Sequence, residues 1–502
     1  MQGLFVLLLA PLAGYGLSYS QAPYEYWWLI FPCFSVFYFL YATLKTKKAV
    51  FFISFLFSFS YFVGGLNWIG NALLVEGNEY RWVWPLAVIA LPILLSLFSA
   101  SLLAFSAGLT KRRTTTGFLA FCIFLSLSEY LRSIAFTGFP WNLYGYTWLG
   151  FLPIAQIANI FGPFMLTFLT IFWGAFLGYF ILKPLKSLVV IMIALIIFSG
   201  SFAYGYLRLA TVQDIYFENY TLKIIQPNIA QEDKWKREKL LENFEKHLSL
   251  SNTESQNQKQ IIIWPETAIS DNILISEEIE RIGNEILNQD DILLSGVLAA
   301  IPDDQKIQYH NALYKFESDR IPERLYSKNH LVPFGEYIPF QDFIPLKPVV
   351  DFTGFEQGGG SITIINEGYP SFSPQICYEI IFPQNMIGNS EPRPDYILTV
   401  TNDAWYGDSA GPYQHFAQAR MRAIEQGLPI VRSANTGISG IINPYGVILK
   451  SLPLLEDGVI SAKLPKKLED TTFYARAGNW TYLLFMFLSV SFFFLRVNRR
   501  KK

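Results

Sequence analysis

The sequence predicts two kinds of fold in one chain: a multi-pass α-helical membrane domain of about eight spans, and an α/β domain of catalytic size. Apolar residues make up 52% of the 502 residues and charged residues only 16%, against about 25% charged in soluble proteins. Long apolar stretches recur, each close to the length that crosses ~30 Å of hydrocarbon. One polar segment alternates short β-branched runs with helical stretches, which indicates an α/β domain.

The apolar stretches define the predicted membrane domain. They lie at 1–19, 24–43, 49–69, 83–108, 116–134, 160–182, 187–206 and 480–496. The first has no basic n-region and no small-residue cleavage site, so a membrane helix is favoured over a removed signal peptide. We therefore expect seven spans in 1–207, and a final span with a basic cytoplasmic tail in 471–502.

The distribution of lysine and arginine predicts the orientation of these spans. Short loops on the cytoplasmic side of a membrane are rich in both residues. They follow the second, fourth, sixth and eighth stretches, as Lys45, Lys47, Lys48, Lys111, Arg112, Arg113, Lys183, Lys186, Arg496, Arg499, Arg500, Lys501 and Lys502. Both termini should therefore be cytoplasmic, and the segment 208–470 should lie on the outer side.

The segment 208–470 holds the predicted α/β domain. Strands are expected at 222–225, 261–264, 292–297, 396–401 and 459–462, and helices at 232–251 and 414–426. Three glycines at 358–360 precede Ser361. They lack the Lys-Ser/Thr of a phosphate-binding loop, so a flexible connector is favoured over a nucleotide site.

Charge and cysteine usage argue against several classes of function. The net charge of −1 provides no basic surface for nucleic acid, so no nucleic-acid partner is expected. The three cysteines, Cys33, Cys122 and Cys377, are far apart, which argues against a disulfide framework or a CxxC metal site. The four histidines have no paired ligand spacing, so no metal site is expected.

Three turns in the α/β domain each carry one residue that could act in catalysis. Glu266 follows a predicted strand that Pro265 ends, Lys328 precedes an apolar turn, and Cys377 leaves a short strand. The carboxyl ends of strands are where α/β folds place ligand-binding groups. Each residue could instead have no catalytic role: Glu266 could be a solvated carboxylate, Lys328 a surface lysine and Cys377 a small buried hydrophobic residue.

Together the three residues form a complete set for acyl transfer. A thiol becomes a strong nucleophile when a neighbouring carboxylate takes its proton. An ammonium favours the thiolate and then the oxyanion of the tetrahedral intermediate. We therefore predict that Glu266, Lys328 and Cys377 are catalytic.

The chain resembles the carbon–nitrogen hydrolase (nitrilase) superfamily and, within it, the apolipoprotein N-acyltransferase family. The resemblance rests on the order of the three turns: Trp264-Pro265-Glu266, then Lys328 with Leu331-Val332-Pro333-Phe334-Gly335-Glu336, then Ile376-Cys377-Tyr378-Glu379. It covers essentially the whole chain, and extends to Thr137-Gly138-Phe139-Pro140-Trp141, Gln226-Pro227-Asn228-Ile229 and Thr401-Asn402-Asp403-Ala404-Trp405-Tyr406-Gly407-Asp408.

The resemblance implies a four-layer α/β sandwich of the nitrilase type in the periplasm, seated on a domain in the bacterial cytoplasmic (inner) membrane. It implies that Glu266 is the general base, that Cys377 attacks the sn-1 ester of a phospholipid such as phosphatidylethanolamine, and that Lys328 stabilises the oxyanion. The resulting thioester then acylates the N-terminal amine of the S-diacylglyceryl-cysteine of an apolipoprotein. No metal, nucleotide or coenzyme A is required, because the ester and then the thioester store the energy.

Five further residues match the family's motifs. The resemblance implies that Glu336, Tyr378 and Glu379 support or orient the catalytic residues. It also implies that Trp235 and Asn311 shape or position the acyl site. From the residues alone, Trp235 could equally be a packed aromatic and Asn311 a turn residue.

The apolar segment 334–352 has two interpretations. It is rich in Phe, Pro, Ile and Val within an otherwise polar domain. Core packing would explain this composition. We favour a membrane-dipping gate, because an acyl donor must leave the bilayer sideways to reach a thiol outside it.

Two other functions are considered. A membrane-anchored amidase or nitrilase acting on small amides would share the three catalytic residues, but it would not explain seven preceding spans. A transporter with an outer binding domain would need ionisable residues that line the spans. The clearest candidates there, Glu129 and Arg132, lie near an outer end and resemble a structural pair.

Overall fold

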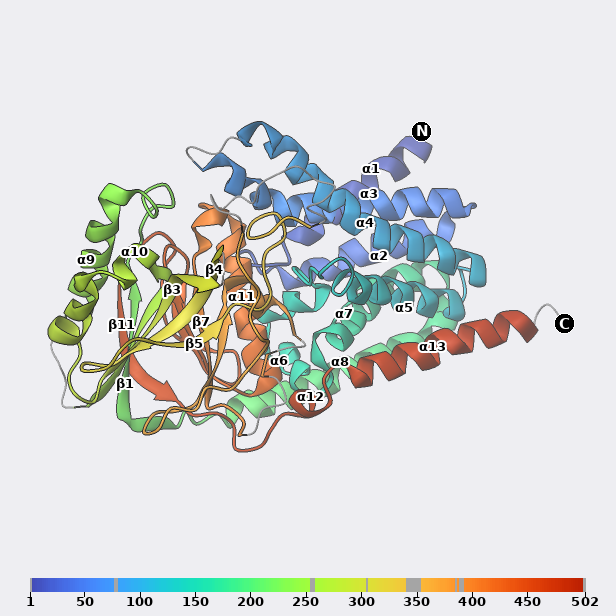
Figure 1. Cartoon of the computed structure of the whole chain (residues 1–502). Helices are drawn as coiled ribbons and strands as arrows, with labels where there is room; N and C mark the ends of the chain where they lie inside the picture. Colours follow the sequence, from blue (N-terminus) through green and yellow to red (C-terminus); the bar gives the residue numbers. More distant parts are fainter. Residues whose placement is uncertain are drawn as a thin grey trace.

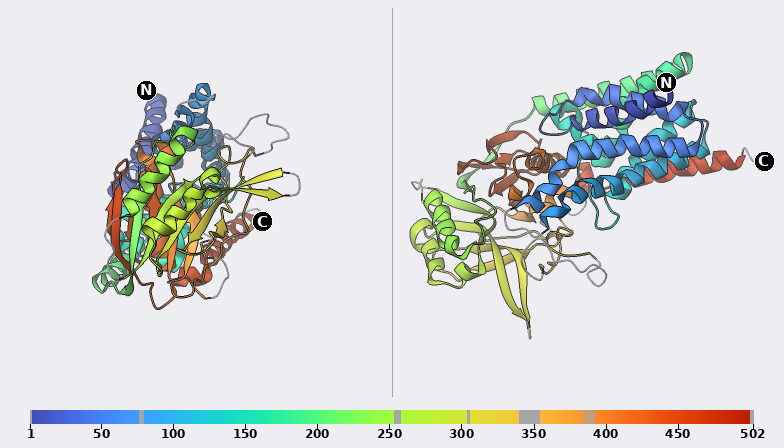
Figure 2. Two further views of the ribbon diagram at one scale, coloured as in Figure 1. Left: turned by 60° about the vertical axis from the view of Figure 1, so that its left-hand side comes forward. Right: turned by 90° about the horizontal axis from the view of Figure 1, so that it is seen from above.

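The computed structural model describes residues 2–75, 80–252, 258–303, 306–339, 354–383, 386–387 and 392–499. Figures 1 and 2 show two parts side by side, an α/β domain and a bundle of helices. Both ends of the chain lie on the side of the bundle. The α/β domain is thus an insertion between two helices of the bundle, α8 and α13.

Each predicted apolar stretch contains a helix. These helices are α1 (Gln2–Ser18), α2 (Ile30–Thr43), α3 (Lys47–Leu66), α4 (Trp84–Leu109), α5 (Thr115–Arg132), α7 (Ala158–Leu182), α8 (Pro184–Ala210) and α13 (Trp480–Arg499), with the short α6 (Leu152–Ala155) before α7 and α12 (Phe473–Ala477) before α13.

Within the described residues, four helical segments are long and apolar enough to cross a membrane: Lys47–Leu74, Arg81–Leu109, Ala158–Leu182 and Pro184–Ala210. Three shorter apolar helices lie at Leu7–Ser18, Trp27–Thr43 and Trp480–Arg496. The count of eight spans therefore stays a prediction.

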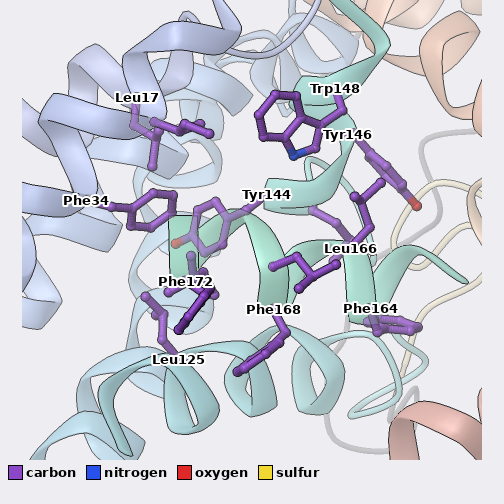
Figure 3. Packing of buried hydrophobic residues seen from close by; sticks show 14 of the residues in the cluster. Leu17, Phe34, Leu125, Tyr144, Tyr146, Trp148, Phe164, Leu166, Phe168 and Phe172 are labelled. Carbon is purple, nitrogen blue, oxygen red and sulfur yellow. The ribbon is translucent and has the colours of Figure 1, made fainter. Parts of the chain in front are cut away.

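Aromatic side chains fill the middle of the bundle (Figure 3). Phe34 of α2 meets Tyr144 edge to face, with 5.0 Å between ring centroids. Tyr144 begins a short 3-10 helix, Tyr144–Gly150, in the connection between α5 and α7, and its side chain is buried. This connection is part of the core rather than a free loop, so it can hold neighbouring groups in place.

The buried pair Glu129 and Arg132 stabilises the start of the same connection. Arg132 Nη2 lies 2.7 Å from Glu129 Oε2, and both side chains are almost fully buried. Arg132 also donates a hydrogen bond to the carbonyl oxygen of Phe139. The contacts are those of a structural pair that ties the end of α5 to the loop after it.

The α/β domain contains two mixed sheets. The first has the order β11-β1-β2-β3-β4-β5 and the second β10-β9-β8-β7-β6. The strands are β1 (Tyr216–Gln226), β2 (Lys259–Ile269), β3 (Ile292–Asp303), β4 (Lys306–Phe316), β5 (Glu323–Ser327), β6 (Phe372–Ile376), β7 (Tyr396–Thr401), β8 (Ile430–Ala434), β9 (Ser439–Ile442), β10 (Ile448–Leu452) and β11 (Gly458–Pro465). In each sheet, three consecutive strands pair in parallel, namely β1-β2-β3 and β6-β7-β8.

Side chains that alternate along each strand point to opposite faces of the sheet, and both faces are buried. In β2, Ile262 and Trp264 pack with Phe244 of α9 (Leu240–Ser251), whereas Ile261 and Ile263 pack against the second sheet, as the two-residue period of a strand requires. The outer face of the second sheet is covered by α11 (Ala410–Gln426), whose apolar side chains share a core with the bundle. The layers run from α9 through the two sheets to α11 and the bundle (Figure 1).

Several predicted boundaries differ from the observed ones, and two of the differences lie beside the site. Of the helix expected at 232–251, only Leu240–Ser251 is α-helical, because residues 231–235 form turns in which Lys234 is buried and Arg237–Lys239 form a short 3-10 helix. The strand expected to end before Pro265 continues to Ile269 as β2, with an irregular register between Trp264 and Ile269. Proline is tolerated at such an irregularity because it does not need to donate a ladder hydrogen bond there. The short helix α10 (Asp271–Leu274) follows.

Candidate active site

The structure brings the three predicted catalytic residues to one end of the sandwich. Lys328 directly follows β5 and Cys377 directly follows β6, as predicted, whereas Glu266 lies in the irregular part of β2 rather than beyond its end. Their exposed fractions are 6% for Glu266, 1% for Lys328 and 6% for Cys377. A carboxylate, an ammonium and a thiol therefore share one buried region, in which electrostatic interactions are stronger than in water.

The Glu266 carboxylate is held at both oxygens. Oε1 accepts a hydrogen bond of 2.7 Å from Asn311 Nδ2 and lies 3.5 Å from Lys328 Nζ. Oε2 accepts a hydrogen bond of 2.7 Å from the backbone N–H of Asn402. The donors come from both sheets, since Asn311 is in β4 and Asn402 follows β7. The carboxylate is therefore fixed at the junction of the two sheets.

Glu336 provides a second carboxylate for Lys328. Lys328 Nζ donates to Glu336 Oε1 at 2.8 Å, and Asn311 Nδ2 lies 3.3 Å from the same oxygen. The other oxygen of Glu336 accepts from the backbone N–H of Val332 at 2.8 Å. Burial alone would lower the pKa of Lys328, but the carboxylates of Glu336 and Glu266 outweigh it and raise that pKa. Lys328 is a fixed positive charge.

Cys377 occupies a strained backbone position at the end of β6. Its φ is +53°, in the left-handed region that non-glycine residues rarely adopt. Burial raises the pKa of its thiol to about 12, with the Glu266 charge adding to the shift and the Lys328 charge opposing it. The resting group is thus a thiol, and it needs a base to become a nucleophile.

Glu379 connects the turn that carries Cys377 to the turn that carries Lys328. Its Oε1 accepts hydrogen bonds from Tyr326 Oη at 2.7 Å and from the backbone N–H of Asn329 and His330 at 2.7 and 3.0 Å. Its Oε2 accepts from the backbone N–H of Ile376 at 2.7 Å. One buried carboxylate thereby sets the distance between β5 and β6 at the site.

Gly358 packs against the Lys328 turn from the other side. Its N–H donates to the carbonyl oxygen of Lys328 at 2.8 Å. A Cβ at Gly358 would lie 2.0 Å from the carbonyl oxygen of Ser327, whereas a Cβ at Gly359 would meet no atom within 4 Å. The glycine run is therefore more than the flexible connector predicted, because its first residue is a close backbone contact.

Lys234 is a site neighbour that the sequence interpretation missed. Its Nζ donates to the carbonyl oxygen of Glu266 at 2.9 Å, and burial lowers its pKa to about 8, with the Glu266 charge opposing that shift. The ring of Trp235 lies 5.7 Å from the same Nζ. Both residues line a cavity on the α9 side of β2, together with Pro265, Thr267 and other residues. The signal in the sequence is the position of Lys234 directly before Trp235, but both residues fall within the helix predicted at 232–251.

A second buried cluster was also missed. Asp403, His415 and Arg432 are buried beside Cys377 and are joined by hydrogen bonds. The string that contains Asp403 was noted in the sequence without a role, and His415 was considered only as a metal ligand. Their shared location depends on contacts between β7, α11 and β8, which no local pattern reports.

The turn that carries Cys377 touches the bundle directly. The hydroxyl of Tyr378, next to Cys377, donates to the carbonyl oxygen of Gly138 at 3.1 Å. Gln414 of α11 accepts hydrogen bonds from the indole N–H groups of Trp68 and Trp141 at 3.0 and 2.8 Å. One end of the bundle therefore forms one wall of the site.

The proposed gate at 334–352 lies mostly outside the described residues, which stop at 339 and resume at 354. Within them, Phe334 has half of its surface exposed and a φ of +62°. The gate stays a prediction, and so do the roles of all eight predicted site residues: Glu266, Lys328, Cys377, Trp235, Asn311, Glu336, Tyr378 and Glu379.

Comparisons with known proteins match both parts of the chain. The carbon-nitrogen hydrolase family model matches residues 221–473, and the model of the apolipoprotein N-acyltransferase N-terminal domain matches residues 13–176. The apolipoprotein N-acyltransferase of Rhodopseudomonas palustris is 35% identical over 496 residues, with 94% of this chain and 91% of the relative covered. That of Rickettsia bellii is 35% identical over 445 residues, with 87% of each covered. An amidase from Nesterenkonia sp. aligns with 51% of this chain and 94% of its own, at 16% identity and a TM-score of 0.33.

Proposed function

The chain belongs to the apolipoprotein N-acyltransferase family, and from this premise we propose the reaction that its site carries out. It transfers a fatty acyl group from the sn-1 position of a phospholipid such as phosphatidylethanolamine to the N-terminal amine of the S-diacylglyceryl-cysteine of an apolipoprotein. The reaction is ping-pong, and the acyl group is held as a thioester on Cys377 between the two steps.

In the first step the thiol is acylated. Glu266 takes the proton from Cys377 Sγ as the sulfur attacks the ester carbonyl carbon, and the oxyanion that forms is stabilised by the Lys328 ammonium. The bond from carbon to the glycerol oxygen then breaks, and Glu266 returns the proton to that oxygen. Lysophospholipid leaves and the thioester remains.

In the second step the acceptor amine attacks the thioester carbonyl carbon. Glu266 takes a proton from the amine as the carbon–nitrogen bond forms, the carbon–sulfur bond breaks, and Cys377 receives the proton back. The amide is the product. The single observation that carries this mechanism is the buried contact between Lys328 and Glu266 beside the buried thiol of Cys377.

The supporting residues have positioning roles in this scheme. Asn311 and Glu336 hold the Glu266 and Lys328 side chains through the hydrogen bonds described above. Glu379 and Tyr378 hold the nucleophile turn between β5 and the bundle. Trp235 lines the cavity behind β2, where we propose that it shapes the acyl site.

We place residues 1–207 as a membrane domain of seven spans, 208–470 as a catalytic domain in the periplasm, and 471–502 as the final span with a cytoplasmic tail. The bacterial inner membrane is the proposed location. Support comes from the basic residues after alternate apolar stretches, which favour a cytoplasmic side at those junctions.

The proposal is tested by detecting the acyl thioester on Cys377. Protein purified from membranes that contain phosphatidylethanolamine should carry an added fatty acyl mass, and hydroxylamine should remove it. Cys377→Ala and Cys377→Ser should carry no such mass and should not transfer acyl groups, because an alcohol is far less acidic than a thiol. Cys33→Ala and Cys122→Ala are the matched controls and should load normally. Loading in Cys377→Ser at most of the unmodified rate would contradict the assignment.

A further inference from the structure

A buried chain of polar groups ends on the backbone of the nucleophile. Nε2 of His415 lies 3.1 Å from the carbonyl oxygen of Cys377, and Nδ1 of the same ring lies 2.9 Å from Asp403 Oδ1. The exposed fraction is 0% for His415 and 1% for Asp403. Buried polar groups of this kind are costly unless they are hydrogen-bonded, so each contact constrains the next.

The chemistry of the carbonyl group fixes the direction of the hydrogen bond between His415 and Cys377. A carbonyl oxygen can only accept, so Nε2 must carry a proton and donate it. Burial and the Arg432 charge lower the pKa of His415, so the ring is neutral and its Nδ1 is an acceptor. Nδ1 accepts from Arg432 Nη2 at 3.1 Å, and the same Nη2 donates to Asp403 Oδ2 at 2.7 Å. Burial alone would raise the pKa of Asp403, but Arg432 and His415 outweigh it and lower that pKa. Asp403 therefore stays ionised and can hold its partner Arg432.

The ring of His415 is also fixed by the bundle. It stacks on the indole of Trp141, with 5.5 Å between centroids and 29° between planes. Trp141 comes from the connection after α5, and its N–H is held by Gln414, the neighbour of His415. The ring is thus fixed at one edge by Arg432 and at one face by Trp141.

The carbonyl group that His415 contacts belongs to Cys377, whose backbone conformation is strained. Cys377 has a φ of +53°, a conformation that costs free energy and persists only when its surroundings hold it. Because a trans peptide keeps C=O and N–H antiparallel, a carbonyl bound to His415 also fixes the direction of the Tyr378 N–H beside the nucleophile. Losing the Nε2–H bond would release both groups at once.

We infer that His415 is a positioning residue for the nucleophile, holding the strained Cys377 backbone through its Nε2–H bond while Arg432 and Trp141 hold the ring. His415 does not touch the reacting atoms in this scheme. The inference rests on the proposed role of Cys377. It also gives the outer loop of the bundle a part in the chemistry, since Trp141 supports the residue that supports Cys377.

The test compares His415→Gln with His415→Asn in the full-length protein. The two side chains differ by one methylene. The amide nitrogen of Gln can reach the position of Nε2 and donate to the Cys377 carbonyl, whereas that of Asn stops near the position of Nδ1. The initial rate of thioester formation is measured by intact mass with phosphatidylethanolamine in vesicles, over a range of lipid concentrations, alongside the Tm of each variant.

The Asn variant should load roughly 100-fold more slowly than the unmodified protein at saturating lipid, as expected for a misplaced reacting group. The Gln variant should load within about tenfold of it. The lipid concentration at half-maximal rate and the Tm should be similar for both variants, because only the nucleophile is displaced. If the Asn variant fails to fold, His415→Phe, which keeps the ring on Trp141 without an N–H, replaces it.

Equal rates in the Gln and Asn variants, whether both fast or both slow, would overturn the inference, because the Nε2–H bond would then make no difference. The inference would also fail if the Asn variant lost both Tm and rate of thioester formation and the Gln variant lost as much of each. Failure of the proposed function looks different, since the unmodified protein itself would then acquire no hydroxylamine-labile mass on Cys377.

Discussion

At the scale of the residue, the environment of each ionisable group decides its charge. Burial keeps Cys377 protonated, while Glu336 and Glu266 keep Lys328 charged. The sequence identified the three residue types, but it could not show which group is charged at rest, because that depends on buried neighbours from other strands. Cys377 is therefore a thiol at rest, whereas the proposed reaction requires its thiolate.

The first prediction concerns the titration of Cys377. Since burial raises its pKa to about 12, the thiolate fraction should grow about tenfold per pH unit across the neutral and mildly basic range. In a Cys33→Ala/Cys122→Ala background, the alkylation rate with iodoacetamide should therefore keep rising from pH 7 to pH 10. Unfolded protein should level off near pH ~8.5–9. A plateau below pH 8 in the folded protein would show a resting thiolate and contradict this assignment.

The second prediction separates stability from chemistry at Lys328. Lys328→Met leaves Glu266 and Glu336 as buried carboxylates without their shared cation, which should cost ~3–5 kcal/mol of unfolding free energy. Adding Glu336→Gln removes one of those charges and should recover a large part of the lost Tm. Acyl loading should stay absent in both variants, because the oxyanion still lacks its ammonium. Loading by the double variant would remove Lys328 from the mechanism.

At the scale of the element, the turns that leave β5 and β6 are held from both sides. Glu379 joins them through backbone N–H groups, and Gly358 closes against the Lys328 turn. The five β-branched runs named from the sequence all lie within observed strands, namely β1, β2, β3, β7 and β11. The prediction that Pro265 ends β2 is wrong, because an irregular register lets the strand continue past a residue that cannot donate.

The third prediction uses the neighbouring glycines as a matched pair. Gly358→Ala would place a Cβ 2.0 Å from the Ser327 carbonyl oxygen, so the end of β5 must shift and Lys328 with it. We expect a loss of ~1–3 kcal/mol in stability and a fall of roughly 100-fold in the rate of acyl loading. Gly359→Ala meets no atom within 4 Å and should behave like the unmodified protein. Equal activity in the two variants would show that this contact does not position Lys328.

At the scale of the whole molecule, the bundle and the α/β domain meet along one seam. The seam includes Tyr378 on Gly138, His415 on Trp141, and Gln414 between two indoles. The apolar stretches predicted the helices, and the resemblance predicted the convergence of Glu266, Lys328 and Cys377. The seam itself was not predicted, because it joins α11 to a loop 273 residues earlier, and no periodicity records such a contact.

The fourth prediction tests the orientation of the molecule in the membrane. In a variant whose three cysteines are replaced by alanine, a new cysteine at Arg320, an exposed loop position of the α/β domain, should react in intact cells with a membrane-impermeant thiol reagent. A new cysteine at Lys186, exposed at the start of α8, should react only after the cells are opened. The opposite result would place the site on the cytoplasmic side and would contradict the proposed access to exported apolipoproteins.

The buried, protonated state of Cys377 has a redox consequence. Thiolates rather than thiols attack disulfides and are oxidised, and the periplasm, where we propose that the site lies, is an oxidising compartment. The same burial that makes the nucleophile depend on Glu266 therefore protects it from oxidation between turnovers. An enzyme built this way can keep a reduced cysteine where exposed thiols are readily converted to disulfides.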